Sequence, residues 1–535
     1  MTVATVAIGA YGLRLARTTS DFLVASREVS PAWNAAAIGG EYLSAASFLG
    51  VAGLVLKHGV DVLWYPVGFA AGYLALLLFV AAPLRRSGAF TLPDFCQLRL
   101  RSTGLRKLAT GFVIVIGWLY LVPQLRGAGL TLQTVSGSPY LVGVLLVGIV
   151  VTTNVALGGM RAVTFVQAFQ YWLKLTALLI PMLFLLLQWQ ADGRPALAPP
   201  AGETFAHETT VTFDQPTRLT LPDGSSEDVP AHTTRVFPAG APIPKVAGAD
   251  VDTGLDWLLP GTSGGGNRGL LATYSLILAT FLGTMGLPHV LVRFYTNPDG
   301  AAARRTTLMV LGLVGLFYLL PALYGVLGRV YTPQLMMSGA TDAVVLRLPA
   351  AALGTGTIGQ LLGALVAAGA FAAFLSSSSG LMTSVAGVLS TDVLGRGSVR
   401  DFRVSAIVAG FVPIVLSSRI SELDVSQVVG LAFAVAASSF CPLLVLGLWW
   451  RGLTAVGAVA GLIAGGGAAV AAVLVTMIGP PLEGWARILI NVPAAWTVPL
   501  AFAVMVLGSL ATRRRVPADV GTTMLRLHAP DALGL

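Results

Sequence analysis

Four consecutive serines, Ser376–Ser379, stand inside an apolar segment that carries no charged residue between positions 360 and 391. A polar side chain in hydrocarbon needs a partner within the protein, and such groups usually face an interior path. Hydroxyl oxygens are hard, neutral ligands, suited to a cation that has lost its water. The serines therefore predict a monovalent cation site inside a membrane bundle, unless they only bond to the preceding turn of their own helix.

A second polar interruption places a carboxylate beside paired glycines in another apolar segment. Glu41 follows Gly39 and Gly40, and Tyr42 and Ser44 come directly after it. Because glycine lowers helix propensity, we expect a broken helix here, whose freed carbonyls can face a cation. A glycine face packed against a neighbouring helix is the alternative explanation.

A third apolar segment carries Gln124 and Arg126 just after Pro123. An arginine at this depth is costly unless it is paired or hydrated. Arg126 can hold the carboxylate of a substrate in a bidentate manner, or it can neutralise Glu41. The sequence leaves both roles open and favours the structural pair with Glu41.

Two more features are candidates for coupling. Polar residues at helical spacing predict one inward-facing stripe, formed by Gln167, Gln170, Tyr171 and Lys174. Lys174 is a candidate counter-charge, although an interior hydrogen-bonded face is the favoured role of the stripe. His289, next to Pro288, is a candidate proton site, and a hydrogen bond at a helix end is the favoured alternative.

The composition is that of a membrane protein. The 535 residues are 55% hydrophobic and 11% charged, with a mean hydropathy of +0.79, whereas soluble domains carry about 25% charged residues. The formal net charge of +9 comes from short clusters between apolar segments, which excludes nucleic acid as a partner. The sequence shows no Asp-rich, His-rich or nucleophile motif, so we expect neither an enzyme nor a bound cofactor.

Apolar windows predict an all-α polytopic protein with about thirteen membrane spans. They lie near residues 1–16, 31–56, 61–83, 108–134, 139–157, 162–189, 268–292, 306–328, 357–391, 404–418, 425–449, 453–478 and 493–512. Lysine and arginine gather at every second boundary between spans. Since these residues prefer cytoplasmic loops, the pattern places the N-terminus outside the cell and the C-terminus in the cytoplasm.

One outer connection, residues 190–267, is rich in acidic residues, Pro, Thr and Gly. Its short patterned stretch at 217–224 predicts a hairpin. A small extracellular cap and a flexible loop remain equal alternatives for the whole segment. Residues 516–535 are expected to form a short cytoplasmic tail.

Several of these segments resemble the sodium:solute symporter family, and within it the acetate/monocarboxylate permease branch. The blocks that carry the resemblance are Gly39–Gly50, Gly158–Gln167 and Gly286–Phe294, with a further fit over Cys441–Gly461. The resemblance runs from about residue 20 to residue 515, apart from the outer connection.

The resemblance implies a core of two inverted five-helix repeats, at 31–189 and 268–449. Residues 1–30 would be a first short span with a cytoplasmic loop, and residues 450–515 peripheral spans. It also implies a sodium site between the first and eighth core helices, with no cofactor. By position, the ligands of that sodium ion would be the carbonyls of Gly40, Leu43 and Ala373 and the hydroxyls of Ser376 and Ser377.

From the resemblance we expect a symporter in the plasma membrane that imports a small organic acid anion, such as acetate, propionate or pyruvate, together with sodium. The first alternative is coupling to protons, with Glu41 or His289 titrating. The second is a different small organic solute. Gln124, Arg126, Lys174, Tyr42 and Ser44 are further candidates for substrate binding or coupling.

Overall fold

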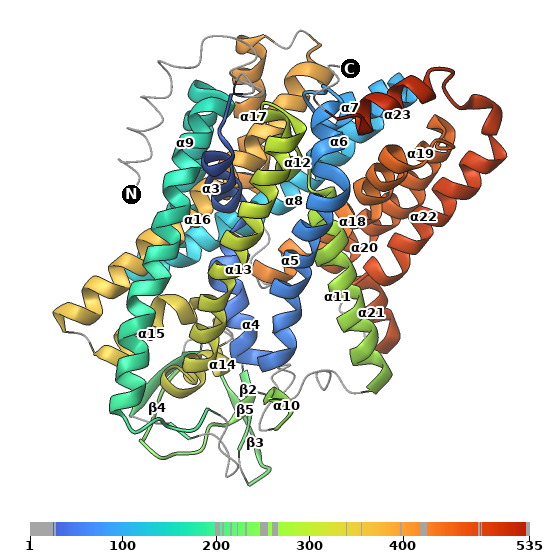
Figure 1. Cartoon of the computed structure of the whole chain (residues 1–535). Helices are drawn as coiled ribbons and strands as arrows, with labels where there is room; N and C mark the ends of the chain where they lie inside the picture. Colours follow the sequence, from blue (N-terminus) through green and yellow to red (C-terminus); the bar gives the residue numbers. More distant parts are fainter. Residues whose placement is uncertain are drawn as a thin grey trace.

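In the computed structural model, helices make up most of the described part of the chain (Figure 1). The structure describes residue 25 and residues 28–530, except for short stretches. The stretches not described are 198–203, 206–207, 214–216, 222, 231–232, 247–254, 259–265, 339, 355, 396–397, 418–424, 480–481 and 483. The predicted span at 1–16 lies outside the described residues.

Nine segments of the described chain are long and apolar enough to cross a membrane. They are Ala46–Arg86, Thr103–Ser136, Tyr140–Ala191, Gly269–Thr296, Gly300–Tyr331, Thr357–Val393, Val425–Trp449, Ala455–Ile478 and Ala494–Ala511. The predicted spans from residue 61 onward fall within these segments or, at 404–418, on a separate helix. At a rise of about 1.5 Å per residue, a hydrocarbon core of about 30 Å needs about 20 residues, so the 41 residues of Ala46–Arg86 and the 52 of Tyr140–Ala191 are long enough for two crossings each.

The first half of the chain contains two helices that are interrupted. Its elements are α3 (Pro31–Tyr42), η2 (Ala46–Gly50), α4 (Val51–His58), η3 (Gly59–Leu63), α5 (Trp64–Ala75), η4 (Leu76–Val80), α6 (Ala81–Arg86), α7 (Leu92–Leu100), α8 (Thr103–Ser136) and α9 (Tyr140–Ala191). The 52 residues of α9 are two helices joined at Gly159, whose φ of 57° and ψ of −163° are not helical. These two parts correspond to the separate spans predicted at 139–157 and 162–189.

The predicted interruption after the paired glycines is present, and it lies three residues further on. α3 ends at Tyr42, and Leu43 has a ψ of 85°, outside the helical region. The helix resumes at Ala45 and continues through η2 into α4.

The second half contains a matching break. Its elements are α11 (Gly266–Gly286), α12 (Pro288–Val292), η5 (Arg293–Thr296), α13 (Gly300–Tyr331), α14 (Gln334–Ser338), η6 (Thr341–Ala343), α15 (Val344–Leu353), α16 (Thr357–Val388), η7 (Leu389–Val393), α17 (Val399–Ser417) and α18 (Val425–Trp449). Leu287 is extended (φ −72°, ψ 115°) between α11 and α12, as expected for a residue that precedes a proline.

The peripheral helices follow in order to the C-terminal end. They are α19 (Ala455–Gly461), η8 (Leu462–Gly466), α20 (Gly467–Ile478), α21 (Gly484–Asn491), α22 (Ala494–Ala511), η9 (Arg513–Arg515) and α23 (Val520–His528). α22 packs against α19 and α18, while α23 contacts α6. Figure 1 shows α23 and α7 at one end of the bundle and the strands at the opposite end.

The outer connection folds into a small β structure. β1 (Thr209–Phe213) pairs with β4 (Thr233–Phe237), and β2 (Thr217–Thr220) lies between β3 (Ser226–Val229) and β5 (Lys245–Val246). The antiparallel pair β2–β3 confirms the predicted hairpin. Its buried apolar residues are Phe205, Val211, Phe213, Leu219 and Val229, which cluster with Met337 of α14.

A tryptophan attaches this outer segment to the helices. Trp257, in the short helix α10 (Leu255–Leu258), donates from Nε1 to the carbonyl of Val55 in α4 at 2.8 Å. The guanidinium of Arg329, at the end of α13, lies 4.8 Å from the centre of the Trp257 ring. The described part of residues 190–267 therefore covers one end of the bundle.

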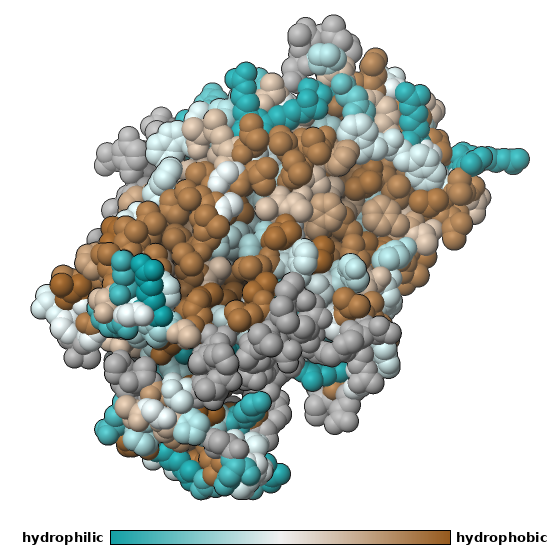
Figure 2. Space-filling model, turned by 60° about the horizontal axis from the view of Figure 1, so that its bottom comes forward, coloured by the Kyte–Doolittle hydropathy of each residue, from teal (hydrophilic) through white to brown (hydrophobic). Residues whose placement is uncertain are grey.

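The outer surface of the bundle suits a lipid environment. Figure 2 shows hydrophobic residues in a broad area over the helices, with hydrophilic residues toward the ends. Leu187, Leu319 and Phe411 are among the most exposed large apolar side chains, at 64%, 63% and 66%. Such exposure over many helices is what a bilayer requires of the surface that faces it.

Candidate functional site

The break between α3 and η2 lies in the interior, where two glycines allow neighbouring helices to approach. A Cβ on Gly40 would lie 2.2 Å from the carbonyl oxygen of Gln167 in α9. A Cβ on Gly380 of α16 would lie 2.0 Å from Oε1 of Glu41. α3 is therefore held between α9 and α16 at contact distances that no larger residue permits.

Gln124 supports the restart of the helix after the break. Its Oε1 accepts a hydrogen bond from the backbone N–H of Ala45 at 2.8 Å, and its Nε2 donates to the carbonyl of Tyr120 at 3.3 Å. The first N–H groups of a helix have no partner within that helix. Gln124 of α8 supplies one, so its role in this structure is to fix the broken helix.

The side chain of Lys174 ends at the break. Its Nζ donates to the carbonyl of Gly40, to the carbonyl of Leu43 at 2.7 Å and to Oγ of Ser376 at 3.0 Å. Lys174 is fully buried, as are Gln167, Gln170 and Tyr171, so the predicted interior stripe of α9 is confirmed. The ammonium lies at the place where the sequence predicted a sodium ion.

The contacts around Nζ suit an ammonium. Ser376 Oγ also lies 3.1 Å from the carbonyl of Ala373 and, when it donates to that carbonyl, accepts from Lys174. Three acceptors thus face Nζ, which matches the three N–H groups of an ammonium.

The five groups predicted as sodium ligands lie together, but with different partners. Gly40, Leu43 and Ser376 bond to Lys174, and the carbonyl of Ala373 accepts from Ser376. Ser377 Oγ donates to the carbonyl of Glu41. The binding of a sodium ion by these oxygens stays a prediction.

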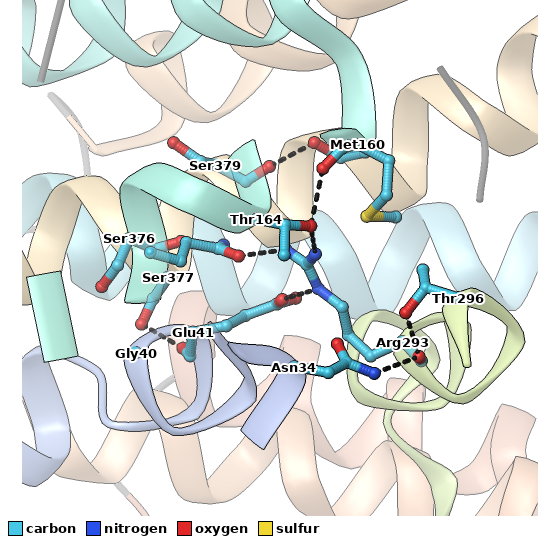
Figure 3. Close-up of polar contacts among 12 residues, drawn as sticks. Asn34, Gly40, Glu41, Met160, Thr164, Arg293, Thr296, Ser376, Ser377 and Ser379 are labelled. Atoms are coloured by element: carbon cyan, nitrogen blue, oxygen red, sulfur yellow. Dashed lines mark hydrogen bonds and ion pairs between the residues drawn. The ribbon is translucent and has the colours of Figure 1, made fainter. Parts of the chain in front are cut away.

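Glu41 forms a buried ion pair with Arg293 (Figure 3). Oε2 of Glu41 lies 2.6 Å from Nε of Arg293, and both side chains are 1% exposed. The guanidinium also donates to Oγ1 of Thr164 at 2.7 Å and to Oε1 of Gln167. Gln167 in turn donates from Nε2 to the carbonyl of Ser376 at 2.8 Å, which links the ion pair to α16.

The predicted pair between Arg126 and Glu41 is wrong, because Arg293 takes that position. Arg126 is partly buried, and its Nη1 has no hydrogen-bond partner in the part of the chain that the structure describes. Its charge acts on Tyr140, at the start of α9. Arg126 is thus still available to a ligand.

Tyr42 points away from the lysine, into a group of aromatic side chains. Its hydroxyl lies 2.8 Å from Oγ1 of Thr284 in α11. Its ring meets those of Tyr73, Phe69 and Phe433 edge-on, with centroids 4.7, 5.6 and 6.2 Å away. This aromatic group joins α3 to α5, α11 and α18.

His289 and Ser44 lie beside the same aromatic group. The His289 ring is 5.3 Å from the ring of Tyr120, and Ser44 is buried next to Tyr120. Both ring nitrogens of His289 and the hydroxyl of Tyr73 are buried without a hydrogen-bond partner among the described residues. The hydrogen bond that we expected for His289 at a helix end is therefore wrong. Buried groups of this kind are costly unless a ligand satisfies them.

Sequence reasoning missed Arg293 as the partner of Glu41. The two residues are 252 positions apart, and no local pattern joins them. A usable signal was the helix break at Pro288, since the breaks in α3–η2 and α11–α12 both lie in the interior. Arg293 follows the second break by one turn and a half of helix.

Comparisons of sequence agree with this geometry. The profile of the sodium:solute symporter family matches residues 22–195 and 244–465. The chain is 30% identical to the uncharacterized symporter YwcA of Bacillus subtilis, over 86% of this chain and 82% of the relative. It is 31% identical to a monocarboxylic acid transporter of Corynebacterium glutamicum, over 96% and 90%.

Solved structures show the same fold. A Na+-coupled sialic acid symporter, substrate-bound and outward-open, superposes with a TM-score of 0.63 at 15% identity, over 95% of this chain and 96% of the other. A nucleobase-cation-symport-1 family transporter in a closed conformation gives a TM-score of 0.53 at 12% identity, over 94% and 98%. The core therefore has the fold of two inverted five-helix repeats. The chain belongs to the sodium:solute symporter family and is a transporter rather than an enzyme.

Proposed function

We propose that this symporter imports a small monocarboxylate together with a monovalent cation. The observation that carries the proposal is the pair of broken helices, one in each repeat, with unsatisfied polar groups between them. The hydroxyl of Tyr73 and the ring of His289 are buried beside these breaks. In secondary transporters such breaks bind substrate and coupling ion near the middle of the membrane.

The ends of the broken helices favour an anionic substrate. The helix that starts at Ala45 and the helix that starts at Pro288 both begin in the interior. The N-terminal end of a helix carries a partial positive charge that attracts carboxylates. The relative from Corynebacterium glutamicum, which is named a monocarboxylic acid transporter, supports the same substrate class.

The coupling ion has two candidates. Sodium is the ion that the sequence and the name of the family favour, and Gly40, Leu43 and Ser376 supply suitable oxygens. A sodium ion reaches these oxygens only if the ammonium of Lys174 leaves them, since it bonds to all three. Protons are the alternative, so the experiment must impose the two gradients separately.

We further propose that the protein lies in the plasma membrane with its C-terminus in the cytoplasm and its N-terminus outside. Near α7 and α23 lie Arg101, which pairs with Asp519, and Arg106, which pairs with Asp94 of α7. Arg85 lies in the last turn of α6, which contacts α23, and the basic run Arg513–Arg515 comes shortly before α23. Positive residues gather on the cytoplasmic side of membrane proteins. The β structure would then face the outside.

The test is uptake of labelled acetate, propionate and pyruvate by the purified protein in liposomes. A sodium gradient, a proton gradient and no gradient are applied in separate samples at a fixed membrane potential. We expect accumulation of at least one acid above the level of empty liposomes, driven by one of the two gradients, and none of labelled proline or glucose. Accumulation of a neutral solute, with no acid taken up in any gradient, would reject the proposal.

A further inference from the structure

We infer that Lys174 is an internal cation that replaces sodium at the break after α3, so that this chain binds no sodium ion there. The inference deepens the proposed function, on which it rests for the role of the site in coupling. It concerns ion binding, which is measured without any transport.

The first step is the match between the ammonium and the predicted ligands. Three of the five oxygens expected to hold sodium accept hydrogen bonds from Nζ, and Ser376 links a fourth, the carbonyl of Ala373, to the same group. All three N–H groups of the ammonium are used. The lone pairs that a sodium ion would need are therefore directed at a positive charge that is already present.

The second step is the balance of charge. The charged group that acts on Lys174 is Glu41, from α3, and Glu41 is paired with Arg293, from η5, at 2.6 Å. With Glu41 neutralised by Arg293, Lys174 already adds one positive charge to this buried region. A sodium ion beside it would add a second one at close range, and buried like charges repel strongly.

The third step is the way the ammonium holds the helices together. Gly40 and Leu43 lie at the end of α3, Ser376 is on α16, and Lys174 is on α9. One ammonium thus joins three helices across the break. A bound cation does the same by drawing oxygens of different helices around itself, so Lys174 performs the structural part of that role permanently.

The test compares sodium binding by the wild-type chain with two variants of Lys174. Lys174→Ala removes the ammonium and leaves a space lined by the three oxygens. Lys174→Met is the matched control, because its apolar chain fills much of that space without charge. Each protein is purified in a sodium-free buffer, and radioactive sodium binding is measured together with the melting temperature in sodium chloride and in choline chloride.

We expect no sodium binding at the break after α3 in the wild-type chain, so Ser376→Ala should not change the sodium binding or the salt dependence of melting of the wild-type chain. Lys174→Ala should bind sodium and melt about 1–3 °C higher in sodium than in choline, as mass action requires for a ligand of the folded state. Lys174→Met should melt lower than the wild type and not respond to sodium. Adding Ser376→Ala to Lys174→Ala should abolish the sodium response.

Two results would overturn the inference. The first is stoichiometric sodium binding by the wild-type chain that Ser376→Ala weakens at least tenfold. The second is a folded Lys174→Ala that ignores sodium. If Lys174→Ala does not fold, the wild-type measurement still decides. Absence of acid uptake in every gradient would instead count against the proposed function, and sodium binding would remain interpretable.

Discussion

Glu41 Oε2 lies 2.6 Å from Arg293 Nε, and this buried ion pair joins α3 to η5, which follows the break between α11 and α12. The carbonyl of Arg293 also accepts a hydrogen bond from Asn34 of α3 at 3.2 Å. The two broken helices are thus connected through both side chain and backbone. Any movement of one repeat against the other must keep or break this connection.

Removing one partner of the pair should destabilise the protein strongly. Glu41→Ala leaves the guanidinium of Arg293 buried without a counter-charge, which typically costs about 3–5 kcal/mol. We expect a large fall in melting temperature and little protein in the membrane. The double variant Glu41→Ala/Arg293→Met should recover part of the loss, since no charge remains unpaired. If the double variant is as unstable as the sum of the two single variants, the pair does not act as a unit.

The close approach of α16 to Glu41 predicts a difference between two glycines of the same helix. Gly380→Ala places a Cβ about 2 Å from the carboxylate of Glu41 and should lower both stability and uptake. Gly363→Ala meets no atom within 4 Å and should stabilise the helix slightly, by roughly 0.5–1 kcal/mol. Melting temperatures of the two variants give the comparison, and equal effects would show that the contact at Gly380 is not tight.

Arg126 is expected to act on the substrate rather than on stability. Because it forms no pair with Glu41, Arg126→Gln should leave the melting temperature near that of the wild type. Loss of a charged hydrogen bond to a carboxylate should raise the half-saturating acid concentration about tenfold or more. The dependence on the coupling ion should not change. An unstable variant, or one with unaltered saturation, would contradict this role.

A partly buried acid near the end of the bundle that we assign to the cytoplasm predicts a pH effect on stability. Burial raises the pKa of the Asp94 carboxyl in α7, although Arg106 lies 2.8 Å away and lowers it. A raised pKa means that ionisation is less favourable in the folded chain, so the stability present at low pH is lost as the pH rises through the folded pKa. The Asp94→Asn side chain cannot ionise, so the variant does not lose this stability as the pH rises.

We therefore expect the melting temperature of Asp94→Asn, relative to the wild type, to be higher at about pH 7 than at about pH 3.5, since the loss begins near the ordinary pKa of 3.8. Thermal unfolding of both proteins at the two pH values is the measurement. Asp228 in β3 is a useful contrast, since its hydrogen bond with Arg218 lowers the pKa of that exposed carboxyl. A relative melting temperature of Asp94→Asn that falls with rising pH would show that Arg106 dominates over burial.

The sequence predicted the spans well because each one depends on a local property, the length of an apolar run. The hairpin at β2–β3 was predicted for the same reason, since it depends on one short stretch of sequence. The pair α14–α15 was missed, since its apolar stretches between residues 334 and 353 are too short for a span and Pro349 interrupts them. The exact position of the break after α3 was also not readable, because the unwound residues are Leu43 and Ser44 rather than the glycines.

The sequence predicted the oxygens of the candidate site but not the contacts of its charged side chains. Ser376 and the carbonyl of Gly40 could be named from local patterns and from the resemblance to a family. The cation among these oxygens is the ammonium of Lys174, which comes from α9. Because Lys174 is 134 residues away from Gly40 in the sequence, no local pattern could indicate their contact. The partner of Glu41 likewise follows from packing between the repeats, which no single segment encodes.

The most direct test of the account is an experimental density map of the wild-type protein prepared in sodium chloride. We expect continuous density from the Lys174 side chain to a position in hydrogen-bond range of the carbonyls of Gly40 and Leu43 and of Oγ of Ser376. We also expect no separate peak among these oxygens. A distinct peak coordinated by them, with Lys174 turned away, would contradict the claim that the chain supplies its own cation.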